Sequence, residues 1–183
     1  NNQIVYSESD NLPFVSIVMA VYNEQKVIEN KITSVFETKY PLEKIEFLIG
    51  SDCSTDKTDE IIAQLYNKYS QIKFTRFENR TGKITIINEL VEKAKGEIII
   101  STDAKAIFLE NTIFNLVKHF KNPEISIVGG ILINEKFDKN GISHQEDLYM
   151  NREMQIKYNE GLIWKSVIGV YGALYAIRKD DFP

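Results

Sequence analysis

The sequence predicts an α/β fold, in which a mostly parallel sheet carries helices on both faces. Short apolar runs of strand length alternate with amphipathic helical patterns, and only short loops separate them. One run, residues 98–100, is three consecutive isoleucines after Gly96, as expected of a strand buried on both faces. Parallel strands need crossover connections, which the helical segments supply.

The first half of the chain repeats one unit of strand, loop and helix. The predicted strands cover residues 15–22, 45–49, 72–77 and 98–100. The helical patterns between them cover residues 27–36, 61–69 and 84–94. In the third helix the apolar face is expected to include Ile84 and Ile87, and Gly96 is expected to end that helix.

Beyond Asp103 the rhythm of the sequence changes. The pattern predicts a helix over 113–120, a strand over 125–133, a turn-rich loop over 134–143, a long helix over 145–164 and a strand over 167–177. We see no repeat, low-complexity tract or linker, so a single domain over residues 1–183 is the simplest interpretation. We expect that domain to be incomplete at its C-terminus, because the chain stops directly after a strand-like segment.

Composition excludes several classes of protein. A length of 183 residues with 43% apolar residues is ample for a sizeable core, and a net charge of −4 gives no general reason to bind nucleic acid. Cys53 is the one cysteine and there are two histidines, which excludes a disulfide framework and a structural zinc set. No apolar run approaches membrane-spanning length and the opening is too polar for a signal peptide, so we expect a soluble, cytosolic chain.

Polar and aromatic residues follow each predicted strand of the first half. They are Tyr22 to Glu24 after the first strand, Asp52 after the second, Arg80 to Lys83 after the third and Asp103 to Lys105 after the fourth. A parallel sheet gathers these loops along one edge, where ligands of such folds bind. An aromatic ring, carboxylates and cations together suit a nucleotide with a diphosphate. Taken alone, Asp103 is equally explained as a cap of the next turn.

Familiar nucleotide and hydrolase motifs are absent from the sequence. Gly82 and Lys83 are reminiscent of a P-loop, but Phe77 stands where its first glycine is required and Ile84 where the magnesium-binding hydroxyl belongs. There is no G-x-G-x-x-G after the first strand and no G-x-S-x-G elbow. Dehydrogenase and hydrolase functions are therefore disfavoured.

Four ordered motifs resemble family 2 glycosyltransferases of the GT-A fold. They are residues 15–24, residues 51–58, residues 80–83 with Asn88, and residues 101–104. Residues 172–178 are similar to the segment that precedes the catalytic carboxylate in bacterial membrane-associated members. The resemblance covers nearly the whole chain, and it implies a Rossmann-like GT-A sheet.

The resemblance also implies roles for individual residues. Ala20, Tyr22 and Glu24 would line the nucleoside pocket, and Asp52 would accept a hydrogen bond from the base, usually uracil; Arg80 and Lys83 would lie by base, ribose or diphosphate, and Asp103 would be the first carboxylate of a D-x-D element, near ribose and metal. Plainer explanations stay open: Glu24 as a helix-terminus charge, Lys83 as a solvated first-turn residue, Tyr22 as core and Asp52 as a turn residue.

Two departures from the family pattern affect the chemistry. Lys105 stands where the family has the second D-x-D carboxylate or an asparagine, and a protonated lysine does not ligate Mn²⁺ or Mg²⁺. Either Lys105 neutralises the diphosphate directly, or Asp103 is the sole protein ligand of a divalent cation. The family's general base lies on a segment that would follow Pro183. Weaker substitutes for that base within the chain are Asp180 and Asp181. Glu146, Glu153 and Glu160 lie at near-helical spacing and are candidates to face an acceptor, although a solvated, charge-paired helix face is the commoner explanation of such spacing.

Together these observations predict a glycosyltransferase. The full protein would transfer a sugar with inversion from a nucleotide-sugar, a UDP-sugar by resemblance, to a glycan or lipid-linked acceptor. It would work at the cytoplasmic face of a membrane, held there by segments outside this chain. The fragment alone is expected to bind nucleotide weakly and to turn over poorly or not at all. One rival is a non-catalytic nucleotide-sugar sensor or scaffold module, and another is a nucleotidyltransferase, which normally has a glycine-rich loop after the first strand.

Overall fold

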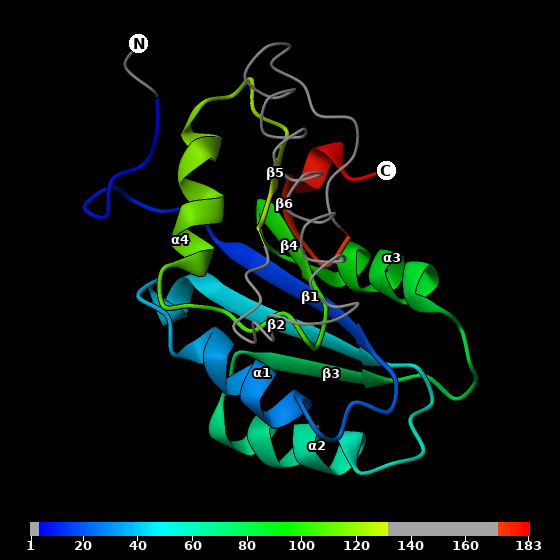
Figure 1. The fold of residues 1–183 in the computed structure, drawn as a ribbon. Helices are drawn as coiled ribbons and strands as arrows, with labels where there is room; N and C mark the ends of the chain where they lie inside the picture. The colour runs from blue at the N-terminus through cyan, green and yellow to red at the C-terminus, as the bar shows by residue number, and fades with distance from the viewer. Residues whose placement is uncertain (1–3, 132–171) are drawn as a thin grey trace, which may run out of the picture.

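The computed structural model describes residues 4–131 and 172–183, which form a six-stranded mixed sheet flanked by helices (Figure 1). The strand order is β3-β2-β1-β4-β6-β5. The strands are β1 (Val15–Val21), β2 (Ile45–Ser51), β3 (Ile72–Arg76), β4 (Ile98–Thr102), β5 (Ile127–Gly129) and β6 (Leu174–Arg178). Strands β1 to β4 are mutually parallel, and β6 runs antiparallel to both β4 and β5. The predicted α/β class is confirmed.

Helices cover both faces of the sheet (Figure 1). They are α1 (Ile28–Phe36), α2 (Thr58–Lys68), α3 (Lys83–Lys93) and α4 (Thr112–Val117), with short 3₁₀ helices η1 (Leu42–Lys44), η2 (Lys118–Lys121) and η3 (Lys179–Asp181). Helices α1, α2 and α4 pack on one face of the sheet and α3 packs on the other. Alternate residues of β1 point to these two faces and contribute to both parts of the core. Of the helices in the described ranges, none is long and apolar enough to cross a bilayer.

The strand register brings the carboxyl ends of the parallel strands to one edge. Val15 of β1 pairs with both Ile45 of β2 and Ile98 of β4, so the three strands begin level with one another. At the other end, Val21 pairs with Ser51. The loops that follow β1, β2 and β4 therefore leave the sheet side by side.

Two details of the α3 region differ from the sequence prediction. Ile84 is 78% exposed in the first turn of α3, and Ile86 takes the fully buried place against the sheet instead. The helix ends at Lys93, before Gly96. Gly96 is needed for close approach: a Cβ added there would lie 2.4 Å from the backbone nitrogen of Ser16 in β1.

A buried carboxylate ties the amino ends of the strands together. Glu46 of β2 is 4% exposed, and its Oε1 accepts hydrogen bonds from Ser16 Oγ and from the Lys95 amide, each at 2.5 Å. Lys73 of β3 forms an ion pair with its other oxygen. Burial acts to raise the pKa of Glu46, but these donors outweigh it and the pKa lies below its ordinary value.

The structure describes only some of the elements that the sequence predicts over residues 125–177. Strand β5 is shorter than predicted, ending at Gly129, and the final strand begins at Leu174. The predicted loop 134–143 and helix 145–164 lie outside the described residues, as do Glu146, Glu153 and Glu160.

Candidate functional site

The loops after β1 and β2 hold each other in place. Asn23 and Cys53, at equivalent places in the two loops, have φ angles of 52° and 57°, in the left-handed region that non-glycine residues rarely adopt. The Thr55 amide donates to Asn23 Oδ1 at 2.8 Å, and the Asn23 amide donates to Ser54 Oγ at 3.2 Å. This cross-linking fixes the neighbouring residues Tyr22 and Asp52, both predicted site residues.

Asp52 organises the loop after β3. Its side chain is buried, and its carboxylate accepts hydrogen bonds from the Thr81 amide at 2.5 Å, from the Gly82 amide at 3.2 Å and from Arg80 Nε at 3.1 Å. Burial acts to raise the pKa of Asp52, but the three donors outweigh it and hold the pKa below its ordinary value. Gly82 has a φ of 91°, which explains the glycine at this turn.

Arg80 also joins Asp52 to Tyr22. The guanidinium carbon lies 3.4 Å from the centroid of the Tyr22 ring, a cation–π contact, and Tyr22 as a residue is 39% exposed. One face of Tyr22 is thus covered by Arg80, and a base that stacks there must displace the guanidinium or stack upon it. Tyr22 therefore lies at the rim of the site, and the alternative that it belongs to the core is wrong.

A second pair lies next along the sheet edge. Lys83, the first residue of α3, places Nζ 2.5 Å from Oδ1 of Asp103, which directly follows β4. The Asp103 amide donates to the carbonyl of Ala173, and Lys83 Nζ lies 3.5 Å from the carbonyl of Gly172, both just before β6. The two side chains are 48% and 41% exposed, so a ligand can reach both.

The other predicted site residues, Ala20, Glu24 and Lys105, do not belong to either of these pairs of contacting side chains. Lys105 is exposed two residues beyond Asp103. Ala20, half-buried in β1, packs against the core beneath α3. Glu24 is half-buried, and its backbone contacts the start of α1. Its carbonyl accepts hydrogen bonds from the amides of Val27 and Ile28, each at 3.0 Å. These contacts gather Tyr22, Asp52 and Arg80 into one group and Lys83 and Asp103 into another.

The structure places Asp180 and Asp181, the two substitutes for the general base, away from the predicted site. Because β6 is antiparallel to β4, Arg178 pairs with Ile98 at the start of β4. Asp180 and Asp181 follow Arg178 and so lie at the opposite edge of the sheet from Asp103. Asp181 accepts a hydrogen bond there from Ser126 Oγ at 2.6 Å. Neither carboxylate is placed to act at the predicted nucleotide site.

Sequence reasoning missed three groups that shape the site. The amides of Thr81 and Gly82 hold Asp52, and backbone donors leave no sequence signal beyond the glycine. Lys31 of α1 is fully buried beneath the loop after β4. The burial of Lys31 has one indication in the sequence. Lys31 is three residues after Ile28 and four before Val35, which places it on the apolar face of the helix.

A metal ion would find few protein ligands here. Over residues 4–131 and 172–183, no three His, Cys, Asp or Glu side chains are grouped so that they could hold an ion. Asp103 is a single carboxylate with Lys83 as its partner. A magnesium site of this type uses one or two carboxylates together with phosphate oxygens of the substrate. Asp103 fits that arrangement only when the substrate supplies the remaining ligands.

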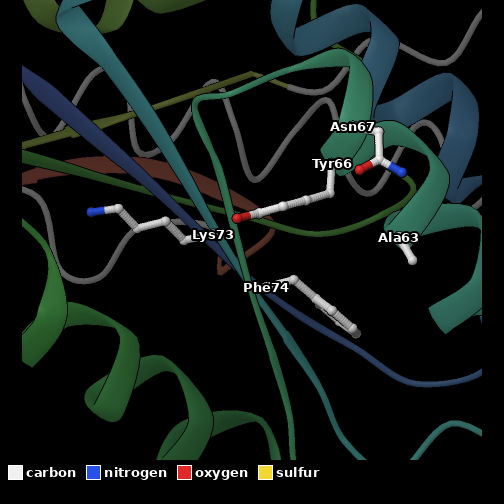
Figure 2. A pocket seen from close by; sticks show the side chains of 5 residues that line it. All are labelled: Ala63, Tyr66, Asn67, Lys73 and Phe74. Carbon is white, nitrogen blue, oxygen red and sulfur yellow. The ribbon is translucent and has the colours of Figure 1, made fainter.

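A cavity elsewhere on the molecule is separate from these residues. Figure 2 shows its lining: Ala63, Tyr66 and Asn67 come from α2, and Lys73 and Phe74 come from the edge strand β3. Lys73 and Phe74 point to opposite sides of the strand, as neighbouring strand residues do (Figure 2). None of the predicted site residues lines this cavity.

Comparison with known proteins gives the same fold. The chain is similar to poly-beta-1,6-N-acetyl-D-glucosamine synthase of Staphylococcus epidermidis, at 33% identity over 128 residues, which are 69% of this chain and 30% of that protein. It superimposes on the mannosyltransferase PcManGT of Pyrobaculum calidifontis, solved with GDP-Man and Mn²⁺, with a TM-score of 0.75 and 22% identity, covering 95% of this chain and 46% of that one.

A further solved structure is TarS 1-349 of S. aureus in complex with UDP-GlcNAc, with a TM-score of 0.56 and 22% identity, covering 69% of this chain and 38% of that one. The chain thus spans less than half the length of each of these proteins. The family model described as "Glycosyl transferase family 2" matches residues 16–182, which include every predicted site residue. The chain therefore belongs to glycosyl transferase family 2.

Proposed function

We propose that this chain binds a UDP-sugar at the carboxyl edge of its sheet, and that the full protein transfers the sugar with inversion to a glycan or lipid-linked acceptor. The observation that carries the proposal is the adjacency of two groups of side chains. Tyr22, Asp52 and Arg80 suit a nucleoside, and Lys83 and Asp103 suit a diphosphate with its cation. The synthase and TarS relatives support a UDP-linked donor and a glycan acceptor.

The nucleoside is proposed to bind beside Asp52. Oδ1 of Asp52 accepts from the Thr81 and Gly82 amides, and Oδ2 accepts from Arg80 Nε and from the same Gly82 amide. The Gly82 amide is thus shared between both oxygens, at 3.3 and 3.2 Å, and the single ring N–H of uracil is proposed to take the place of one of these two long contacts. The Arg80 guanidinium, planar and held over Tyr22, offers a second surface for stacking. Ala20 and Glu24 are proposed to complete the pocket wall.

The diphosphate is proposed to lie against Lys83 and Lys105. The chain has a net charge of −4, so an anionic ligand has to be held by local cations of this kind. Both ammonium groups are on the edge that carries Asp103, and Lys83 is already fixed by that carboxylate. Neutralisation at this position stabilises the UDP leaving group as the bond to the sugar breaks.

A divalent cation, Mn²⁺ or Mg²⁺, is proposed to share Asp103 with the oxygens of the diphosphate. When bound, such an ion adds positive charge to the leaving group. The structure of PcManGT holds Mn²⁺ with its donor, which supports cation use in this fold. Lys105, in the place of a second carboxylate, would take over part of that neutralising charge.

The acceptor hydroxyl must lose a proton as it attacks the anomeric carbon. Asp180 and Asp181 lie at the other edge of the sheet, so neither serves. We propose that the general base follows Pro183 in the full protein, and that this chain of residues 1–183 is an incomplete domain that binds donor without efficient turnover. We also propose membrane association, at the cytoplasmic face, through segments outside this chain.

Isothermal titration calorimetry tests the donor site. The chain is titrated with UDP, UDP-GlcNAc and GDP-mannose, each with Mn²⁺ and with EDTA. We expect UDP and the UDP-sugar to bind and GDP-mannose to bind at least tenfold more weakly, since the donor and acceptor groups of the two bases differ. Absence of binding under every condition would falsify the donor-site proposal, and equal binding of GDP-mannose would remove the assignment to uracil.

The rival function, a non-catalytic nucleotide-sugar sensor, makes a different prediction for the full protein. The exposed Lys105 in place of a second carboxylate is the observation that favours it. A transferase releases UDP from the donor when acceptor is added, whereas a sensor binds the donor and releases none. A coupled UDP-release assay on the full protein separates the two.

A further inference from the structure

Helix α1 contains a fully buried lysine. Lys31 has no exposed surface and lies on the helix face that also buries Ile28, Ile32 and Val35. Lysine is almost never fully buried unless it is paired, because removing an ammonium group from water is costly.

These contacts are made with the segment that follows β4. Lys31 Nζ donates to Thr102 Oγ1 at 2.9 Å and to the carbonyl of Ala106, and it lies 3.5 Å from the centroid of the Phe108 ring. Among the residues that the structure describes, no carboxylate lies within ion-pair distance of Lys31. The ammonium is thus satisfied by residues 102–108 in place of a counter-ion.

Asp103 lies between the two hydrogen-bond acceptors of Lys31. The Ala106 amide donates to the carbonyl of Asp103 at 3.1 Å, which closes a turn, and the Asp103 amide donates to the carbonyl of Ala173 at 3.0 Å. The turn is therefore held by Ala173, the residue before β6, and by Lys31 of α1. Burial lowers the pKa of Lys31, and the charge of Asp103 acts against that shift, so the two groups sense each other.

We propose that Lys31 is a positioning residue for the diphosphate half of the site: it fixes the turn over residues 102–106 and so the direction of Asp103 and Lys105. The inference rests on the proposed function, since the turn matters for activity only if it meets a nucleotide-sugar. Lys83 engages Asp103 from α3, and Lys31 holds the backbone of the same turn from α1. Two lysines, on helices that cover opposite faces of the sheet, thus fix the position of the Asp103 carboxylate.

The test compares the affinity for UDP, which carries the diphosphate, with the affinity for uridine, which lacks it. In Lys31→Met, which keeps the length and apolar stem but removes the ammonium, we expect UDP affinity to fall about tenfold, as for other supporting contacts behind a binding group. Uridine, which reaches only the base half, should bind within twofold of the wild type. Ile32→Val, a neighbouring buried change without a polar group, is the matched control and should leave both affinities unchanged. Calorimetry measures UDP and an NMR titration measures uridine.

A measurement without ligand tests the turn itself. Amide hydrogen exchange at Asp103 and Ala106 should be faster in Lys31→Met and unchanged in Ile32→Val. If Lys31→Met does not fold, Thr102→Val removes one acceptor of the same lysine and should give a smaller loss for UDP alone. Unchanged UDP affinity, or equal losses for UDP and uridine, would overturn the inference. If the wild type binds neither, the proposed function fails, and exchange alone decides whether Lys31 holds the turn.

Discussion

Lys83 Nζ lies 2.5 Å from Oδ1 of Asp103 and joins the first turn of α3 to the end of β4. Both side chains are about half exposed, and ion pairs of that kind contribute about 0 to 1 kcal/mol to the free energy of unfolding. The pair is thus of little value for folding, yet it sits where four loops converge. A ligand-binding role explains its position better than a structural role does.

The first prediction concerns the Asp103 carboxylate. In Asp103→Ala we expect nucleotide-sugar binding to be abolished, because the proposed cation loses its protein ligand and Lys83 loses the group that directs it. The free energy of unfolding should change by less than about 1 kcal/mol, as for other exposed ion pairs. Calorimetry with UDP-GlcNAc and urea unfolding measure the two effects.

Asp10→Ala is the matched control for that change. Asp10 pairs with Lys121 at 2.9 Å with similar exposure, on the segment before β1 and away from the candidate site. We expect it to bind UDP-GlcNAc like the wild type. Wild-type affinity in Asp103→Ala would place the donor elsewhere on the molecule.

The second prediction concerns Lys105. In Lys105→Asp a second carboxylate stands two residues after Asp103, which restores the D-x-D pattern, and hard divalent cations prefer such oxygen ligands. We expect UDP binding to become more dependent on Mn²⁺ than in the wild type, with the ratio of affinities with Mn²⁺ and with EDTA rising about tenfold, the size of effect typical of one charged ligand contact.

Lys105→Ala distinguishes the gain of a carboxylate from the loss of a lysine. It should weaken UDP binding in EDTA without increasing the effect of Mn²⁺. If Lys105→Asp leaves the manganese dependence unchanged, Lys105 lies outside the cation site and the D-x-D comparison does not apply to this chain.

The fold was predictable because each strand and helix of the first half carries its own local pattern. Three consecutive isoleucines identify β4 without any tertiary information. The errors are tertiary in origin. The sequence pattern predicts that Gly96 ends a helix. The structure shows that a glycine is needed there because the backbone passes close to Ser16, and no pattern along the sequence displays that contact. The spacing of Ile84 predicts a core position, yet Ile84 lies exposed in the first turn of α3.

The residues of the site were predictable, but their partners were not. Asp52 and Arg80 follow different strands, and the topology alone brings their loops to one edge. That Asp52 is bound by the amides of Thr81 and Gly82 depends on backbone direction, which residue types do not encode. The burial of Lys31 runs against the usual pattern, because charged residues on helices are usually solvated.

The third prediction concerns the pH dependence of stability through Glu46. Its folded pKa is below the ordinary value of 4.5, so the ionised form is the one that stabilises the native state. That stabilisation is complete above about pH 4.5, the pKa of an unperturbed glutamate, and is lost as the pH falls through the lower, folded pKa. Glu46→Gln should therefore be less stable than the wild type by about 2 kcal/mol at pH 7, and the difference should shrink below pH 4.5.

Urea unfolding across the acidic range measures this difference. Glu43→Gln is the matched control, because Glu43 is exposed in η1 and its neutralisation should change the free energy of unfolding by less than about 0.5 kcal/mol. A Glu46→Gln deficit that stays constant down to pH 3 would show that shape and not charge is what the site requires.

The last prediction concerns Asp52 as the organiser of the base half. Asp52→Asn keeps the shape but replaces one acceptor oxygen by an NH₂ donor, which faces the donors Arg80, Thr81 and Gly82. The turn at residues 80–82 should loosen, and Arg80 should leave the Tyr22 ring. We expect UDP and uridine affinities to fall together, by about tenfold, since one lost charge-assisted hydrogen bond is worth about 1.5 to 3 kcal/mol. Asp59→Asn, which breaks the comparable pair with Arg76 at the same sheet edge, should leave both affinities unchanged. Loss of UDP affinity with uridine unaffected would instead assign Asp52 to the diphosphate.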